Sequence, residues 1–361
     1  MNLTESTTSG GLSGSGTIYN NTASSTSTLT INTASGNADF AGVIKDGNGT
    51  VSVTKTGSGT QILSGSNTYT GATTISAGEL EVNGSLSASS PVTVASGATL
   101  SGSGTVAGTV SVTSGTINGS GLNLGATTLN SSSTLSGYNI ASSVTVANGT
   151  TSLTGTTKST SALSVSAGAA LDANGTIAGS ATVSGLLKGA TTVTGNLTLT
   201  SGTLAPGDNY GITKVTGSFT MDVSSKLVEE VGGTVAGTSY DQVRVSGNVS
   251  LAGTLDLSTL SGLTLGTTII LIDNTSTGTT TGYFATIITS GSTYTLTSNS
   301  DNTFTVGTTT YLLSYSSDAD GDTYSNDVTL TVVPEPETWA ILVGGVGLLI
   351  GFQRMRRIAN A

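Results

Sequence analysis

The sequence predicts an all-β protein, a right-handed parallel β-helix (β-solenoid) followed by a short C-terminal transmembrane helix. Three observations support this prediction. Apolar residues recur every six positions, in short bursts where Val and Thr alternate. Only 8% of the 361 residues are charged and 51 are Gly, which favours a thin, extended core over a compact one. One apolar run stands apart near the C-terminus, between a proline-containing tripeptide and three arginines.

Residues 1–30 are predicted to form a less regular N-terminal end. The segment from Met1 to Glu5 carries neither the basic part nor the apolar part of a secretion signal. The C-terminal tail described below implies export, so the two ends of the chain conflict. We therefore expect that the true N-terminus is missing, through truncation or a misplaced start codon.

Residues 31–205 are predicted to form the regular part of the β-helix. Bursts such as Val92-Thr93-Val94 are too short for helix turns, and their alternation is typical of strands. One strand every six residues gives three strands per roughly 18 residues, which suits one triangular coil of a parallel β-helix. Two series of apolar residues follow this spacing: Val94, Leu100, Val106 and Val112, then Val165, Leu171, Ile177 and Val183.

Asn-Gly pairs recur along the same segment and are predicted to form the corners between strands. Asn and Gly tolerate positive φ, which tight turns require. These pairs begin at Asn48, Asn83, Asn118, Asn148 and Asn174.

Residues 40–80 carry a more specific pattern, in which short β-type segments follow one another with Gly between them. This pattern resembles the autotransporter-associated β-strand repeat of passenger-type surface proteins. The resemblance implies a β-helix displayed outside the cell, and the later coils are similar to degenerate copies of the repeat. The segments that carry the resemblance span residues 40–44, 53–60, 63–71 and 73–80.

Residues 206–333 are predicted to form the C-terminal coils and the cap of the β-helix. Strands lengthen after Pro206, and the segments 240–247 and 251–255 resemble the coils that close passenger β-helices. Aromatic residues gather here, as expected where the open end of a solenoid must be covered. They are Tyr240, Tyr283, Phe284, Tyr294, Phe304, Tyr311 and Tyr315.

Residues 334–361 form a distinct tail. Its apolar run from Trp339 to Phe352 would extend about 21 Å as a helix, less than the roughly 30 Å hydrocarbon core of a membrane. A buried core helix or an interfacial segment is therefore the alternative to a transmembrane helix over about 338–353. The basic end at 354–357 favours the transmembrane reading, because positive charge stays in the cytoplasm. Its arginines are Arg354, Arg356 and Arg357.

This tail resembles the PEP-CTERM sorting domain of Gram-negative bacteria. The resemblance rests on Pro334-Glu335-Pro336, the apolar run and the arginines in that order. It implies that an exosortase-type sorting enzyme reads the tripeptide while the tail lies transiently in the inner membrane. Cleavage would then release the β-helix to the outer surface or the extracellular matrix.

The composition excludes several functions. A net charge of −10, with no basic patch in the body, makes nucleic-acid binding improbable. Cys is absent, so disulfides and thiolate chemistry are excluded, and the absence of His removes the usual base of nucleophilic triads.

One segment has the residues of a calcium loop. Asp318, Asp320 and Asp322 alternate, and Asn326 follows, which would offer hard oxygen ligands to Ca²⁺. The sequence also fits a polar hairpin loop that joins a strand over 311–315 to one over 328–332. The hairpin is the favoured interpretation, and no other cofactor is indicated.

The sequence favours a protein that is not an enzyme. Glu79 and Glu81 would share the solvent side of a strand, because Leu80 and Val82 would face inward. Enzymes on β-helices usually place an Arg or Lys among carboxylates, and Arg244 near Asp241 is the one pair of this kind that merits testing.

The leading hypothesis is therefore an exported structural or adhesive surface protein, sorted through its PEP-CTERM signal and associated with extracellular polysaccharide or a biofilm matrix. A long face of Ser, Thr and Asn with almost no charge suits such contacts. The alternative is a carbohydrate-active enzyme on the same β-helix, a polysaccharide lyase or hydrolase.

Overall fold

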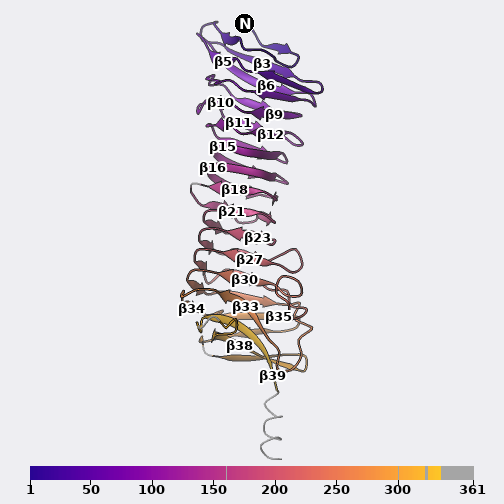
Figure 1. Ribbon diagram of the computed structural model, residues 1–361, viewed down its shortest axis with the longest axis vertical. Helices are drawn as coiled ribbons and strands as arrows, with labels where there is room; N and C mark the ends of the chain where they lie inside the picture. Colours follow the sequence, from indigo (N-terminus) through magenta and orange to yellow (C-terminus); the bar gives the residue numbers. More distant parts are fainter. Residues whose placement is uncertain (160, 300, 322–323, 335–361) are drawn as a thin grey trace, which may run out of the picture.

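The computed structural model describes residues 1–159, 161–299, 301–321 and 324–334. These residues form an elongated, all-β solenoid of about 11 turns, with the N-terminal end at one tip and an antiparallel cap at the other (Figure 1). Through most of the chain each strand pairs in parallel with the strand three positions later. For example, β19 (Leu163–Val165) pairs with β22 (Ala181–Val183), which pairs with β25 (Leu197–Leu199). The predicted β-solenoid with three strands per coil is confirmed.

Three strands per coil give the solenoid three faces. The strands of the first face are β1 (Thr7–Ser9), β3 (Thr26–Asn32), β6 (Thr50–Thr56), β8 (Thr73–Ile75), β11 (Val92–Val94), β14 (Val110–Thr113), β19, β22, β25, β28 (Phe219–Met221), β31 (Val249–Leu251) and β34 (Thr280–Gly282). The strands of the second face are β4 (Asn37–Phe40), β7 (Thr60–Leu63), β9 (Glu79–Val82), β12 (Thr99–Gly102), β17 (Thr150–Leu153), β20 (Ala170–Ala173), β23 (Leu186–Lys188), β26 (Thr203–Ala205), β29 (Lys226–Val228), β32 (Thr254–Leu257) and β35 (Thr286–Thr289). The strands of the third face are β2 (Thr17–Asn20), β5 (Val43–Asp46), β10 (Ser85–Leu86), β13 (Thr105–Val106), β18 (Thr156–Ser159), β21 (Thr176–Ala178), β24 (Thr192–Val193), β27 (Ile212–Val215), β30 (Gln242–Val245) and β33 (Thr268–Asn274).

The core follows from strict alternation along each short strand. In β11, Val92 and Val94 are buried and Thr93 is exposed, because successive side chains of a strand point to opposite sides. All eight residues of the two six-residue series are buried, which confirms that this spacing marks the inward positions.

Two coils depart from the short-strand pattern. β15 (Thr116–Asn130) and β16 (Thr134–Asn148) each run unbroken around a whole coil. β15 pairs successively with β12, β13 and β14, one strand from each face. Gly121, whose φ is 113°, lies at a register shift between β15 and β16, where the chain bends from one face to the next.

The predicted corners are confirmed for the Asn-Gly pairs at 48–49, 83–84 and 174–175, which lie in bends between strands, and Asn148-Gly149 lies at the end of β16. The prediction is wrong for Asn118-Gly119, which lies within β15, and its reason, a positive φ, is wrong for most of the pairs. Only Gly149 among the five glycines has a positive φ. The others are needed for space. A Cβ added to Gly84 would lie 2.1 Å from the carbonyl oxygen of Gly65 in the preceding coil, and one added to Gly175 would lie 2.1 Å from that of Gly155. Corner glycines therefore let successive coils approach each other.

An antiparallel cap closes the C-terminal end, as predicted. β39 (Asp327–Val333) pairs with both β33 and β38 (Thr309–Ser317), and β37 (Asn302–Val306) pairs with β38. A short hairpin between β35 and β36 (Thr293–Thr295) adds to it. Aromatic rings fill the cap: the Phe284 and Tyr315 centroids lie 6.2 Å apart, and those of Phe304 and Tyr311 lie 5.6 Å apart.

Among the described residues, no helix is long and apolar enough to cross a membrane. The predicted transmembrane helix over about 338–353 and the basic end at 354–357 lie outside the described residues.

Candidate functional site

A continuous column of hydroxyl side chains runs along the first face, and we call it the hydroxyl ladder. Its rungs are in register, each directly opposite the next. Neighbouring strands lie about 4.8 Å apart, so the ladder extends over roughly 60 Å. Its residues are Thr8, Thr30, Thr54, Thr74, Thr93, Ser111, Thr128, Thr145, Ser164, Thr182, Thr198, Thr220, Ser250 and Thr281.

The core places these hydroxyls on the surface. From Thr30 to Ser250, both chain neighbours of every rung are buried, so the rung itself must point outward. Within the described part of the chain, only Thr281 donates its hydroxyl to another group, the carbonyl oxygen of Val249 at 3.2 Å. The remaining rungs are therefore available as hydrogen-bond donors and acceptors.

Charge is almost excluded from the first face. Its strands contain one charged residue, Lys55, and this side chain is turned inward and buried. The Lys55 Nζ donates to the carbonyl oxygens of Thr56, Gly57 and Ala77 at 2.7, 2.9 and 3.2 Å. Burial lowers the pKa of Lys55, and the nearby Glu79 carboxylate partly offsets this. Lys55 is a functional candidate that its charge hides and its position reveals, because it follows the inward residues Val51 and Val53 in the alternation of β6.

The ion pairs lie on the other two faces. On the second face, Lys188 bridges Asp172 at 2.9 Å and Asp208 at 2.7 Å. On the same face, Lys226 contacts Asp256 at 3.1 Å. The first face is thus the neutral surface of an otherwise acidic protein.

The structure does not bring Arg244 and Asp241 together as a pair. On the third face, Arg244 Nε instead donates to Asp273 at 2.7 Å, and a guanidinium nitrogen donates to Gln242 at 3.1 Å. Asp241 is buried and accepts the backbone N–H groups of Gly211 and Glu230, each at 2.8 Å. Burial raises the pKa of Asp241 to about 7 despite these donors.

Glu79 and Glu81 occupy the half-exposed side of β9, opposite the fully buried Leu80 and Val82, as the alternation predicted. Glu79 accepts hydroxyl donors from Thr60 and Ser101 on neighbouring coils. These contacts are those of surface carboxylates that link one coil to the next.

Glu229, which directly follows β29, is a buried acid. Its side chain is fully buried, and neither carboxyl oxygen has a hydrogen-bond partner within the described residues. Burial, followed by repulsion from Asp241, raises the pKa of Glu229 well above its ordinary value. The alternation of side chains could have predicted its burial, because Glu229 lies between Leu227 and Val231 at every second position and all three face inward.

The Asp segment forms the predicted hairpin connection. β38 and β39 pair antiparallel, with Ser317 opposite Asp327. Asp318 accepts the N–H of Gly321 at 3.1 Å, and the Asn326 amide nitrogen donates to the carbonyl oxygens of Ser276 and Gly278, each at 2.8 Å. Asp322 lies outside the described residues. Among the residues that the structure describes, no group of three or more acidic side chains could hold a metal ion.

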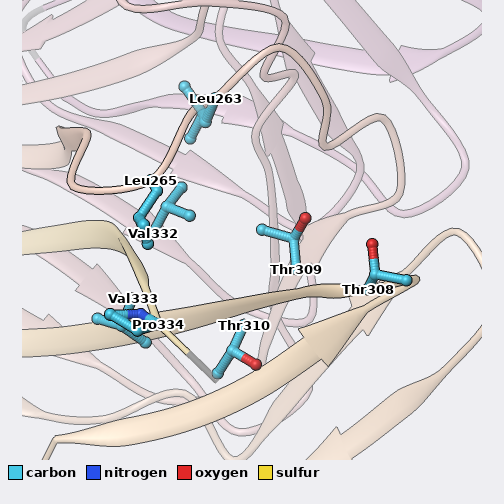
Figure 2. A pocket seen from close by; sticks show the side chains of 8 residues that line it. All are labelled: Leu263, Leu265, Thr308, Thr309, Thr310, Val332, Val333 and Pro334. Carbon is cyan, nitrogen blue, oxygen red and sulfur yellow. The ribbon is translucent and has the colours of Figure 1, made fainter. Parts of the chain in front are cut away.

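A shallow, mostly apolar groove lies beside the last strand, and we call it the cap groove (Figure 2). Its volume is about 240 Å³. Leu265 is 66% exposed, and Figure 2 shows it on the same side as Val332, Val333 and Pro334, the last described residue, with Thr308 and Thr309 across from them. The groove is lined by Leu263, Leu265, Thr308, Thr309, Thr310, Val332, Val333 and Pro334.

Of the predicted sorting residues, only Pro334 is placed by the structure, at the end of β39 and in the wall of the cap groove. Glu335, Pro336 and the arginines Arg354, Arg356 and Arg357 lie outside the described residues.

Comparison with known proteins gives one family match. The model of the passenger-associated-transport-repeat matches residues 53–82, the segment that runs from within β6 through β9. This match supports the predicted passenger-type repeat over that segment. No curated protein matches the chain.

Proposed function

We propose that the chain is an exported structural or adhesive surface protein, which contacts neutral polysaccharide through its hydroxyl ladder and is sorted through a PEP-CTERM tail. The passenger-associated repeat at residues 53–82 and the β-solenoid both fit an exported surface protein. The adhesive role and the sorting route go beyond these two observations and are argued separately below.

The observation that carries the adhesive role is the hydroxyl ladder. Ser and Thr hydroxyls both donate and accept hydrogen bonds, as do the hydroxyls of a polysaccharide. The ladder repeats its rungs over roughly 60 Å, so an extended chain lying along it can make many weak contacts at once. The scarcity of charge on this face favours neutral over acidic polymers.

The ladder role is tested by placing three carboxylates on adjacent rungs, as Thr128→Glu, Thr145→Glu and Ser164→Glu. Burying carboxylates against a neutral polymer without partners is unfavourable, so binding to neutral polysaccharides should weaken roughly tenfold or more. The matched control places the same charges on adjacent outward positions of the second face, as Thr99→Glu, Thr116→Glu and Thr134→Glu. Equal affinity of the two variants would contradict the proposal.

The sorting role rests on the resemblance of the tail to PEP-CTERM domains. In this proposal an exosortase-type enzyme reads Pro334-Glu335-Pro336 while the apolar run lies in the inner membrane and Arg354, Arg356 and Arg357 stay in the cytoplasm. Two prolines remove backbone donors and hold the segment extended, which suits entry into a protease groove. Intact-mass analysis of surface-extracted protein should give a mature chain that ends near Glu335. A mature species that retains Trp339 would refute cleavage.

A second candidate function is a carbohydrate-active enzyme. The observation that favours it is a small pocket lined by charged side chains. Lys188, Asp208, Glu230 and Asp241 line a pocket of about 160 Å³. The hydrogen bonds that Lys188 donates to Asp208 and Asp172 raise its pKa to about 12, which makes it a poor general base at neutral pH. Polysaccharide cleavage that is lost in Lys188→Ala or Arg244→Ala would favour the enzyme.

A further inference from the structure

The cap groove is a fixed feature of the surface. The loop before β33 is held against β39, since the N–H of Gly266 donates to the carbonyl oxygen of Val332 and the N–H of Val332 donates to that of Thr267, each at 2.9 Å. The Thr268 and Thr331 hydroxyls meet at 2.8 Å. Leu265 is thus presented to solvent on a rigid loop, at 66% exposure, instead of folding into the cap.

The groove has the wrong size for two of its conceivable occupants. Its volume of about 240 Å³ is below the roughly 300–1,000 Å³ of typical small-molecule pockets. A helix formed by the apolar run from Trp339 to Phe352 would be about 21 Å long, far larger than a groove lined by eight residues. A shallow apolar edge of this kind suits contact with a broad surface.

The chain itself indicates which surface that is. Pro334 lines the groove, and the apolar run begins five residues later at Trp339. Five residues span at most about 17 Å even when fully extended. A bilayer that takes up the apolar run is therefore always within about this distance of the groove.

The charges agree with this placement. None of the eight lining residues is charged, although the whole chain carries a net charge of −10. An anionic membrane surface repels carboxylates, so an uncharged edge is the part of this protein that approaches such a surface most easily. The threonines Thr308, Thr309 and Thr310 also offer hydroxyls to lipid headgroups.

We propose that the cap groove is a membrane-docking edge: Leu263, Leu265 and Val333 dip into the interface of the bilayer that holds the tail, and seat the solenoid end-on beside its sorting tripeptide. This proposal rests on the proposed function, because it uses the tail as the membrane anchor. It adds a second contact, made by the folded body.

The full chain, reconstituted in vesicles of phosphatidylethanolamine and phosphatidylglycerol, allows a direct test. The chain has no Cys, so Leu265→Cys provides a single site for a polarity-sensitive fluorophore, at a side chain exposed enough to tolerate the label. The matched control is Tyr138→Cys, which is 43% exposed and six strand spacings, about 29 Å, from the β33 coil. Trp339, the one tryptophan, reports separately on the tail.

We expect lipid-attached quenchers to reduce the fluorescence of the Leu265 probe and of Trp339 severalfold, and to leave the Tyr138 probe unchanged. A Trp339 that is quenched beside an unquenched Leu265 probe would overturn the docking edge and leave the tail proposal intact. A quenched Leu265 probe beside an unquenched Trp339 would show that the cap groove contacts lipid without the tail in the bilayer, and would overturn the tail as the membrane anchor. A Leu265 probe already shielded without vesicles would identify the occupant as the chain's own tail or, if concentration-dependent, a second copy, and would also overturn the docking edge.

Discussion

At the scale of single residues, the most consequential side chain is Glu229, a carboxyl group buried without a hydrogen-bond partner among the described residues. Its pKa is raised well above 4.5 in the folded chain, so the folded state keeps the proton that the unfolded chain releases near pH 4.5. The contribution of Glu229 to stability is therefore greatest below that pH and falls as pH rises toward the folded-state pKa. Asp241, with a pKa raised to about 7, acts in the same direction.

We predict that Glu229→Gln raises the thermal midpoint at pH 8 and changes it little at pH 4. The amide keeps the shape of the protonated acid and has no proton to lose. Each kcal/mol of relieved penalty should raise the midpoint by about 1–2 °C in a chain of 361 residues. Differential scanning calorimetry at the two pH values measures the effect, and Glu230→Gln, at the half-exposed neighbouring position, is the control. An equal shift at both pH values would show that ionisation is not involved.

At the scale of elements, the corners decide how closely the coils stack. Gly84→Ala would place a Cβ 2.1 Å from the carbonyl oxygen of Gly65, so the coils must separate locally. We predict a loss of roughly 1–3 kcal/mol, as for other overpacked sites. Gly10→Ala, where a Cβ meets nothing within 4 Å, should be close to neutral. Chemical denaturation of the two variants measures both. A neutral Gly84→Ala would mean that the ladder adjusts freely at its corners.

The hairpin loop between β38 and β39 is the element that bears on calcium. Asp318 accepts an N–H within the turn, and Asp327 accepts the N–H groups of Asn274 and Ala319 at 3.0 and 3.2 Å. Because these oxygens already have donors, we predict the same thermal midpoint in calcium and in chelator. A midpoint that rises with calcium would instead show an ion bound to the native loop.

The sequence predicted the inward positions well and the partnerships across coils poorly. A six-residue spacing is a local property of the chain, so Val94 and Val183 could be placed in the core directly. The pairing of Arg244 with Asp273 depends on which coil lies next to which, and the coil between them is longer than 18 residues. Spacing within one coil carries no information about that register. The sequence predicted a face rich in Ser and Thr. It did not predict that the hydroxyl residues of successive coils lie directly opposite one another along the whole face.

Glu229 and Lys55 show a second limit. Both are charged residues at inward positions, and composition alone assigns such residues to the surface. The alternation of their own strands places them inside, so pattern and residue type disagree. The two residues are accommodated in different ways. Lys55 donates hydrogen bonds to three backbone carbonyl oxygens, whereas the raised pKa of Glu229 keeps that side chain protonated to higher pH.

At the scale of the whole molecule, each coil of a solenoid contacts only its neighbours, so stability should vary along its length. We predict that Phe284→Ala, which empties a fully buried ring site of the cap, destabilises the C-terminal coils by about 3–5 kcal/mol. Amide hydrogen exchange should accelerate over about residues 280–330 and stay unchanged over about residues 90–115.

Leu100→Ala is the matching change in a middle coil, where faster exchange should be confined to the coils around it. If either substitution accelerated exchange evenly from end to end, the solenoid would unfold as a single cooperative unit, and the nearest-neighbour description would be wrong.

The parallel register also governs the order in which the molecule can form. Val92 pairs with Val110, eighteen residues later, and even the long C-terminal coils pair Phe219 with Val249, thirty residues later. A chain that emerges as an unfolded thread through a narrow channel can therefore complete one coil each time such a length appears, without waiting for the rest. Each finished coil offers the unpaired edges of its strands as the template for the next coil, and a folded coil is wider than an extended chain. Folding of this solenoid can act as a ratchet that draws the chain outward.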